Sequence, residues 1–138
     1  MKPSLPLTAG AVALALALPA FASILPEPQT LNGITYLSGG IGQDEAAAMK
    51  AEAKRYPLSI IFSEGRHDAY VANAKVTIAD ASGKTVLDAV SVGPIMLVKL
   101  PAGRYRISAM AAGKTLQREA QVKAKGDEQV LFHWSKIA

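Results

Sequence analysis

The chain of 138 residues contains no cysteine. This absence excludes disulfide bridges, which small exported proteins often use to compensate for a small core. It also excludes a thiolate metal site, a cysteine nucleophile and the lipid-modified cysteine of a bacterial lipoprotein. Histidine is scarce as well, with only two in the chain. Many metal-binding and nucleophilic mechanisms are therefore not open to this sequence.

Aromatic residues are also few, at 6% of the chain, and the formal net charge at pH 7 is a mild +4. Apart from Lys2, the cations are spread from Lys50 to Lys136 rather than gathered in a run. Such a spread is typical of a solvated surface. A nucleic-acid partner is therefore not expected.

Long apolar runs are absent from the chain except at its start. Lys2 precedes an apolar run over residues 5–18, Pro19 breaks the helix, and residues 20–22 read Ala-Phe-Ala. This three-part layout is that of a secretory signal peptide. We expect residues 1–22 to be cleaved and the mature protein to be periplasmic or secreted. The alternative is an uncleaved anchor, because the apolar stretch extends to Leu25 and approaches the length of a membrane span.

From Leu58 onward, apolar and polar residues alternate with a period of two, which is typical of strands half-buried in an antiparallel sheet. Glycine- and proline-containing turns separate these runs, and short strands at such spacing predict a sandwich or a barrel. The predicted apolar faces are Leu58/Ile60/Phe62, Val76/Ile78, Tyr105/Ile107/Ala109, Leu116/Ala120/Val122 and Val130/Phe132/Trp134. Arg118 falls on the apolar side of the fourth run.

The residues before this region predict a different organisation. We expect residues 23–42 to form an extended arm, a short strand at 34–38 and a glycine turn. A helix over residues 43–56 should follow, ended by Pro57, with Ala46, Met49, Ala53 and Tyr56 on one packing face. The β-sandwich domain should then occupy residues 57–138.

The glycine-rich stretch "SGGIGQDE" at residues 38–45 invites comparison with a phosphate-binding loop. It lacks the Gly-Lys-Ser/Thr ending of a P-loop and the third small residue of the dinucleotide fingerprint. Asp44 and Glu45 also place negative charge where a phosphate would bind. We expect a turn that docks the helix. Asp44 and Glu45 remain candidates for an interaction surface or, as a minor variant, for holding a cation.

Two further groups of residues could carry function. His67, Asp68 and His133 could serve a metal site or a small hydrolase, but their spacing matches no known ligand motif, and no serine lies in a Gly-x-Ser-x-Gly context. Arg104 and Arg106 should line an exposed sheet face, where they could bind anionic lipid, glycan or an acidic protein. Outward-facing cations on strands also protect edges from pairing, which is the reading we favour. We expect no catalytic residue, no metal and no cofactor.

Residues 69–114 resemble the carboxypeptidase regulatory-like, or transthyretin-like, domains. The resemblance rests on an "A-x-V-x-I" strand at residues 74–78 and on "L-P-A-G-x-Y-x-I" at residues 100–107. It implies a mainly β fold, a seven-stranded antiparallel β-sandwich of prealbumin type, here preceded by one short helix. It also implies a domain without catalytic machinery that binds protein or carbohydrate.

These observations lead to one functional expectation and one alternative. We expect a non-catalytic exported β-sandwich module that binds a protein, a glycan or another component of the cell envelope. The alternative is a small periplasmic hydrolase or metal-binding protein that uses His67, Asp68 and His133. Sandwiches with open edge strands can also pair with one another, so a homo-oligomer is a further expectation.

Overall fold

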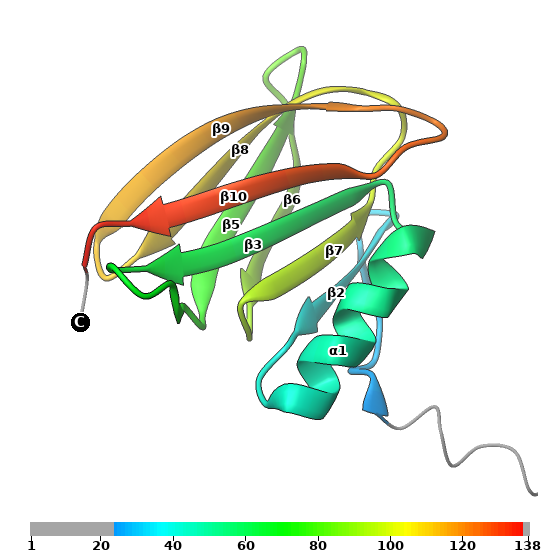
Figure 1. Cartoon of the computed structure of the whole chain (residues 1–138). Helices are drawn as coiled ribbons and strands as arrows, with labels where there is room; N and C mark the ends of the chain where they lie inside the picture. Colours follow the sequence, from blue (N-terminus) through cyan, green and yellow to red (C-terminus); the bar gives the residue numbers. More distant parts are fainter. Residues whose placement is uncertain (1–23, 137–138) are drawn as a thin grey trace, which may run out of the picture.

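The structure is a computed structural model that describes residues 24–136, which form ten strands and one α-helix (Figure 1). The expected signal peptide, residues 1–22, lies outside the described residues. The strands are β1 (Gln29–Leu31), β2 (Ile34–Gly39), β3 (Leu58–Glu64), β4 (Ala69–Tyr70), β5 (Ala74–Asp80), β6 (Thr85–Ser91), β7 (Ile95–Lys99), β8 (Gly103–Ala111), β9 (Lys114–Val122) and β10 (Glu128–Trp134). Helix α1 (Gln43–Glu52) continues into the 3₁₀ turn η3 (Ala53–Arg55).

The strands form two open sheets. The larger sheet has the order β1-β2-β7-β3-β10, with the short β4 paired to the end of β3. The smaller sheet has the order β6-β5-β8-β9. Every pairing in the two sheets is antiparallel except that of β3 with β10, which is parallel. The described chain is therefore mainly β.

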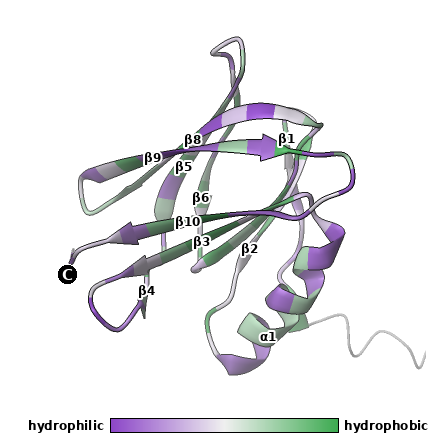
Figure 2. Cartoon of the chain, turned by 45° about the horizontal axis from the view of Figure 1, so that its top comes forward, coloured by the Kyte–Doolittle hydropathy of each residue, from purple (hydrophilic) through white to green (hydrophobic). Residues whose placement is uncertain are grey.

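The main core contains residues of both sheets. Each predicted apolar face is buried or packed against this core, from Leu58, Ile60 and Phe62 on β3 to Val130, Phe132 and Trp134 on β10. Figure 2 colours much of β3 and β10 as hydrophobic and the turn between β3 and β4 as hydrophilic. The period-two prediction is confirmed for β5, β8 and β10, where burial alternates as predicted. Strands β3 and β7 depart from it, because Ser59 on β3 is buried and four successive residues of β7 are buried.

Three aromatic rings close the core at the side where β9 and β10 meet. Phe62, Phe132 and Trp134 stack in pairs with centroids 5.8–6.3 Å apart. The Trp134 indole donates a hydrogen bond of 3.0 Å to the Lys114 carbonyl of the other sheet. Arg118, on the apolar side of β9, places its guanidinium 5.5 Å from the centre of the Phe132 ring. A cation over an aromatic face is a favourable contact, which explains this charged residue on an otherwise apolar face.

Helix α1 adds a partial third layer on the outer face of the larger sheet. Met49 and Tyr56 pack with Leu37 of β2 and with Ile95 and Leu97 of β7 in a second apolar cluster. Of the predicted packing face, Ala46 and Met49 of α1 are buried as expected, and Ala53 and Tyr56 pack in the second cluster. The predicted end of the helix at residue 56 is wrong, because α1 ends at Glu52 and Tyr56 is extended after the 3₁₀ turn. Strand β7 is consequently buried on both faces, which is why "IMLV" reads as a continuous apolar run.

The structure corrects the predicted topology in three respects. Residues 29–31 are not an extended arm, because an Asn32–Gly33 turn with positive φ at both residues folds β1 back onto β2. Strand β2 lies inside the larger sheet rather than before the β domain. The expected β domain of residues 57–138 holds eight of the ten strands within its described part, the two-residue β4 included, and β3 pairs with β10 in parallel rather than antiparallel. Local alternation cannot reveal this last pairing, because it shows which face is buried and not which strand lies alongside.

The two sheets are joined at a close backbone crossing. Between β6 and β7 the chain passes against β2, where Gly93 lies so near Gly39 that a Cβ on Gly93 would collide with the Gly39 backbone. Val92 N–H donates a hydrogen bond of 3.1 Å to the Ser38 hydroxyl, and the Ser91 hydroxyl donates one of 2.8 Å to the Gly93 carbonyl. Only glycine allows this crossing without displacement of the backbone.

We therefore expect Gly93→Ala to lower the free energy of unfolding by about 1–3 kcal/mol, the usual cost of overpacking. Gly126→Ala is the matched control, because a Cβ there meets only ordinary contacts of 3.4 Å or more. Urea unfolding followed by circular dichroism measures both variants. Equal stability of the two variants would contradict the crossing described above.

Candidate functional site

The glycine loop between β2 and α1 binds no external anion in this arrangement, because the side-chain carboxylate of Glu45 occupies its N–H groups. Glu45 Oε1 accepts hydrogen bonds from Gly40 N at 2.8 Å and from Ile41 N at 3.4 Å. These N–H groups would otherwise be available to a phosphate. Gly42 is the N-cap of α1 and offers no side-chain cap, so Glu45 provides the closure of the loop. Asp44, exposed in the same first turn, complements the helix dipole.

His133, Asp68 and a serine absent from the sequence-based prediction meet on the outer face of the larger sheet. His133 Nδ1 lies 2.9 Å from Ser63 Oγ and 3.5 Å from Asp68 Oδ1. The parallel register of β3 and β10 places Ser63 and His133 directly opposite each other. Asp68 adopts a positive φ of 51° in the turn that follows β3. His67 is exposed in the same turn.

The three side chains do not have the geometry of a catalytic triad. In a triad the serine faces one imidazole nitrogen and the carboxylate orients the ring through the other. Here both Ser63 and Asp68 approach Nδ1. Within residues 24–136, no group of three or more His, Asp or Glu side chains is placed to hold a metal ion. The cluster of Ser63, Asp68 and His133 thus acts as a polar tie between β3, β10 and the intervening turn.

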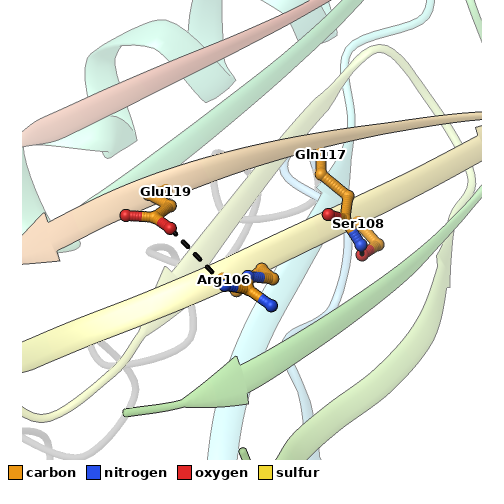
Figure 3. A network of polar contacts seen from close by, with 4 residues as sticks. All are labelled: Arg106, Ser108, Gln117 and Glu119. Carbon is orange, nitrogen blue, oxygen red and sulfur yellow. Dashed lines mark hydrogen bonds and ion pairs between the residues drawn. The ribbon is translucent and has the colours of Figure 1, made fainter.

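Arg104 and Arg106 project from the outer face of the smaller sheet. Arg106 forms an exposed ion pair with Glu119 of β9, with Nη2 and Oε2 3.6 Å apart, beside a Gln117–Ser108 hydrogen bond of 3.2 Å (Figure 3). These contacts follow the β8–β9 register, in which Arg106 faces Glu119 and Ser108 faces Gln117. An exposed pair of this kind adds at most about 1 kcal/mol to stability.

A shallow hollow beside Arg104 and Arg106 is organised by the loop after β5. Its volume is about 410 Å³. Asp80, at its rim, accepts hydrogen bonds from the Ser82 hydroxyl and from the Ser82 and Lys84 N–H groups. The bond from the Ser82 hydroxyl is the largest of the causes that lower the pKa of Asp80. Asp80 is engaged by its own turn, and Glu119, which also lines the hollow, pairs with Arg106, so the hollow offers an anionic ligand mainly Arg104.

A groove lined largely by apolar residues lies beside α1, with a volume of about 320 Å³. Ile95 of β7, Ile61 of β3 and Leu131 of β10 lie opposite one another in a row across its floor. Burial fades along this row with distance from α1: Ile95 is 6% exposed, Ile61 is half-buried and Leu131 is 57% exposed. Tyr70 of β4, 62% exposed, forms a wall.

Charged side chains of both signs line the same groove. Lys50 projects from α1 on one side, and Asp68 stands in the turn before β4 on the other. Sequence reasoning missed this site, although a signal existed. Ile61 and Leu131 are apolar residues at positions where the period-two pattern of their strands calls for polar ones. Two such exceptions on neighbouring strands indicate an apolar patch on the outer face.

No helix within residues 24–136 combines the length and the hydrophobicity that crossing a bilayer would require. A scan against protein-family models finds no model that matches the chain, and a search of curated proteins finds no matching sequence.

The loop closure by Glu45 generates a stability prediction. Glu45→Ala should lower the free energy of unfolding by about 1.5–3 kcal/mol, because two loop N–H groups lose a charged acceptor. Asp44→Ala, in the same helical turn, should lose only the dipole interaction of about 0.3–1 kcal/mol. Thermal and urea denaturation compare the pair. If both variants lose the same stability, Glu45 has no special role in closing the loop.

Proposed function

We propose that this protein is an exported, non-catalytic β module that binds a partner protein through the groove beside α1. One observation carries the proposal: Tyr70 and Leu131, both largely exposed, contribute apolar surface to one groove rather than lying scattered. Isolated exposed apolar residues are ordinary on protein surfaces, whereas a contiguous apolar groove rimmed by charge is typical of an interaction site.

The groove fits an apolar side chain of a partner, flanked by charged residues. Burial of a side chain such as Leu131 or Tyr70 in an interface contributes roughly 1.5–3 kcal/mol. Tyrosine is enriched among the residues that dominate binding energy because it combines a large apolar ring with a polar hydroxyl. Lys50 and Asp68 present opposite charges to the partner, which would fix its orientation more than its affinity.

The fold and location expected from the sequence belong to this proposal. We propose that the two sheets form a sandwich of prealbumin type related to the carboxypeptidase regulatory-like domains. Seven strands of five or more residues lie between residues 57 and 136, three in the larger sheet and four in the smaller, and β2 adds a further such strand to the larger sheet. Two sheets that share one core support the proposal. The signal-like sequence of residues 1–22 supports export to the periplasm or the exterior.

Site-specific photo-crosslinking in cells tests the groove. A photoreactive amino acid at Tyr70 should capture one defined protein, and Leu131→Lys in the same chain should abolish the capture, because a charge would be buried in the contact. Val90→Lys is the matched control, since Val90 is a 47% exposed apolar residue on β6 of the other sheet. It should leave capture unchanged.

Direct binding of the captured protein, once purified, completes the test. Leu131→Lys should weaken the affinity by about tenfold to a hundredfold, equivalent to the 1.4–2.8 kcal/mol of one lost apolar contact. Val90→Lys should stay within about twofold of the unmodified protein. An affinity indifferent to Leu131→Lys, or a Val90→Lys loss of equal size, rules out the groove as the binding surface.

The alternative function, a small hydrolase or metal-binding protein, has one observation in its favour: the cluster of Ser63, Asp68 and His133 borders the same groove. Of the three residues expected to form this site, Asp68 and His133 lie close together. His67 is exposed in the same turn as Asp68 and has no hydrogen bond or ion pair with either residue. The shared use of Nδ1 leaves His133 poorly placed to relay a proton. Binding therefore takes precedence over catalysis as the proposal.

A fluorophosphonate probe, which labels activated serines, separates the two functions. We expect no labelling of the purified protein. Activation of Ser63 would need a histidine that faces Oγ with one ring nitrogen and is held by a carboxylate through the other, and His133 is not held in this way. Mass spectrometry of the intact chain measures the adduct, and a known serine hydrolase labelled in parallel serves as the positive control. Labelling lost in both Ser63→Ala and His133→Ala would favour the hydrolase instead.

A further inference from the structure

Cations that the sequence spreads widely converge at one end of the fold. Lys54 and Arg55 of η3 and Lys123 and Lys125 of the β9–β10 connection line a hollow of about 410 Å³. The turn between β7 and β8 supplies part of its wall. Figure 1 shows these three connections at the same end of the molecule, where α1 finishes and β10 begins.

The hollow is strongly positive. None of the described residues that line it is acidic. Arg55 pairs loosely with Glu52, with Nε and Oε1 3.8 Å apart, and the Arg55 side chain stays largely exposed. Asp127 and Glu128 line a neighbouring hollow, to which Lys123 and Lys125 also contribute.

A fifth cation, Lys99, lies outside the lining of the hollow but contacts the Tyr56 ring. Lys99 Nζ lies 5.2 Å from the centre of the Tyr56 ring, and Tyr56 itself lines the hollow. Burial, followed by the charge of Glu52, raises the pKa of Tyr56, so the phenol remains neutral at physiological pH and adds no negative charge.

Folding alone explains only part of this arrangement. Lys54 and Arg55 follow the C-terminus of α1, where cations complement the helix dipole. Lys123 and Lys125 lie in the β9–β10 connection and complement no helix dipole. This connection places their positive charges at the rim of the hollow, where Lys54 and Arg55 also lie. Like charges gathered around one hollow repel each other, and an anion placed between them would remove that repulsion.

We propose that this hollow binds a small ligand that carries two or more phosphate groups, such as a phosphorylated sugar, independently of the groove beside α1. Three of its four lining cations are lysines, which bind phosphate as point charges, and the fourth, Arg55, can donate paired hydrogen bonds to phosphate oxygens. Of the large hydrophobic side chains exposed in residues 24–136, none lines the hollow. This argues for a discrete ligand over insertion into a membrane surface.

Isothermal titration with inorganic pyrophosphate at about 20 mM salt tests the hollow, because low ionic strength preserves charge interactions. The double variant Lys123→Gln/Lys125→Gln should weaken binding about tenfold or more, the combined effect of two exposed charge contacts. Lys75→Gln/Lys136→Gln removes the same net charge from exposed positions elsewhere. This control should stay within about twofold of the unmodified protein.

Amide chemical shifts measured in the same titration should change at residues 54–56 and 123–126 and remain constant at residues 61–70. If both double variants lost the same affinity for pyrophosphate, binding would depend only on the net charge of the protein, and the proposal would be overturned. Absence of pyrophosphate binding would overturn it as well. Vesicles of phosphatidylglycerol form a separate arm. Binding to them without binding to pyrophosphate would show a membrane-surface site and also defeat the proposal.

Discussion

The outer face of the larger sheet carries more apolar surface than its single helix can cover. A helix of ten residues is about 15 Å long and about 10 Å wide, so it spans roughly two strands set 4.8 Å apart. Helix α1 covers β2 and β7 and packs Met49 between them. Strands β3 and β10 lie beyond its reach, and Ile61 and Leu131 are left at the surface. The groove is the direct result of this mismatch between helix width and sheet width.

Several polar groups that resemble functional sites are instead satisfied within the fold. Glu45 fills the glycine loop, Asp80 closes its own turn, and the contacts of His133 with Ser63 and Asp68 join two strands and a turn. Each of these side chains has a residue type associated with catalysis or ligand binding. The partners they find in the structure leave little capacity for a ligand. The groove beside α1 and the hollow of Lys54, Arg55, Lys123 and Lys125 differ in character: the groove is apolar with charge of both signs at its rim, and the hollow is lined by cations and by no acidic residue.

The sequence predicted the inner faces of the strands well because burial imposes a period of two that any half-buried strand must show. It also predicted the packing face of α1. It failed where structure depends on contacts between distant residues. Strand β7 shows no alternation in its sequence because it is buried on both faces. The β3–β10 pairing joins two segments whose own sequences do not indicate that they are neighbours. The groove could be predicted only in part. Ile61 and Leu131 are apolar where polar residues are expected, but they indicate one patch only once β3 and β10 are known to be neighbours. The positive hollow could not be predicted, since Lys54 and Lys125 lie 71 positions apart in the chain.

The parallel pairing of β3 with β10 also has a consequence for how the chain acquires its structure. Ser63 and His133, opposite each other in this ladder, are separated by 70 residues. Contacts of such long range slow folding, because the entropy of closing the loop is lost before the contacts form. During synthesis β3 is complete long before its partner exists, and Phe62 has neither Phe132 nor Trp134 to stack against. The hairpins β5–β6 and β8–β9 can form earlier from neighbouring segments. We therefore expect the larger sheet to be completed after these hairpins, when β10 pairs with β3.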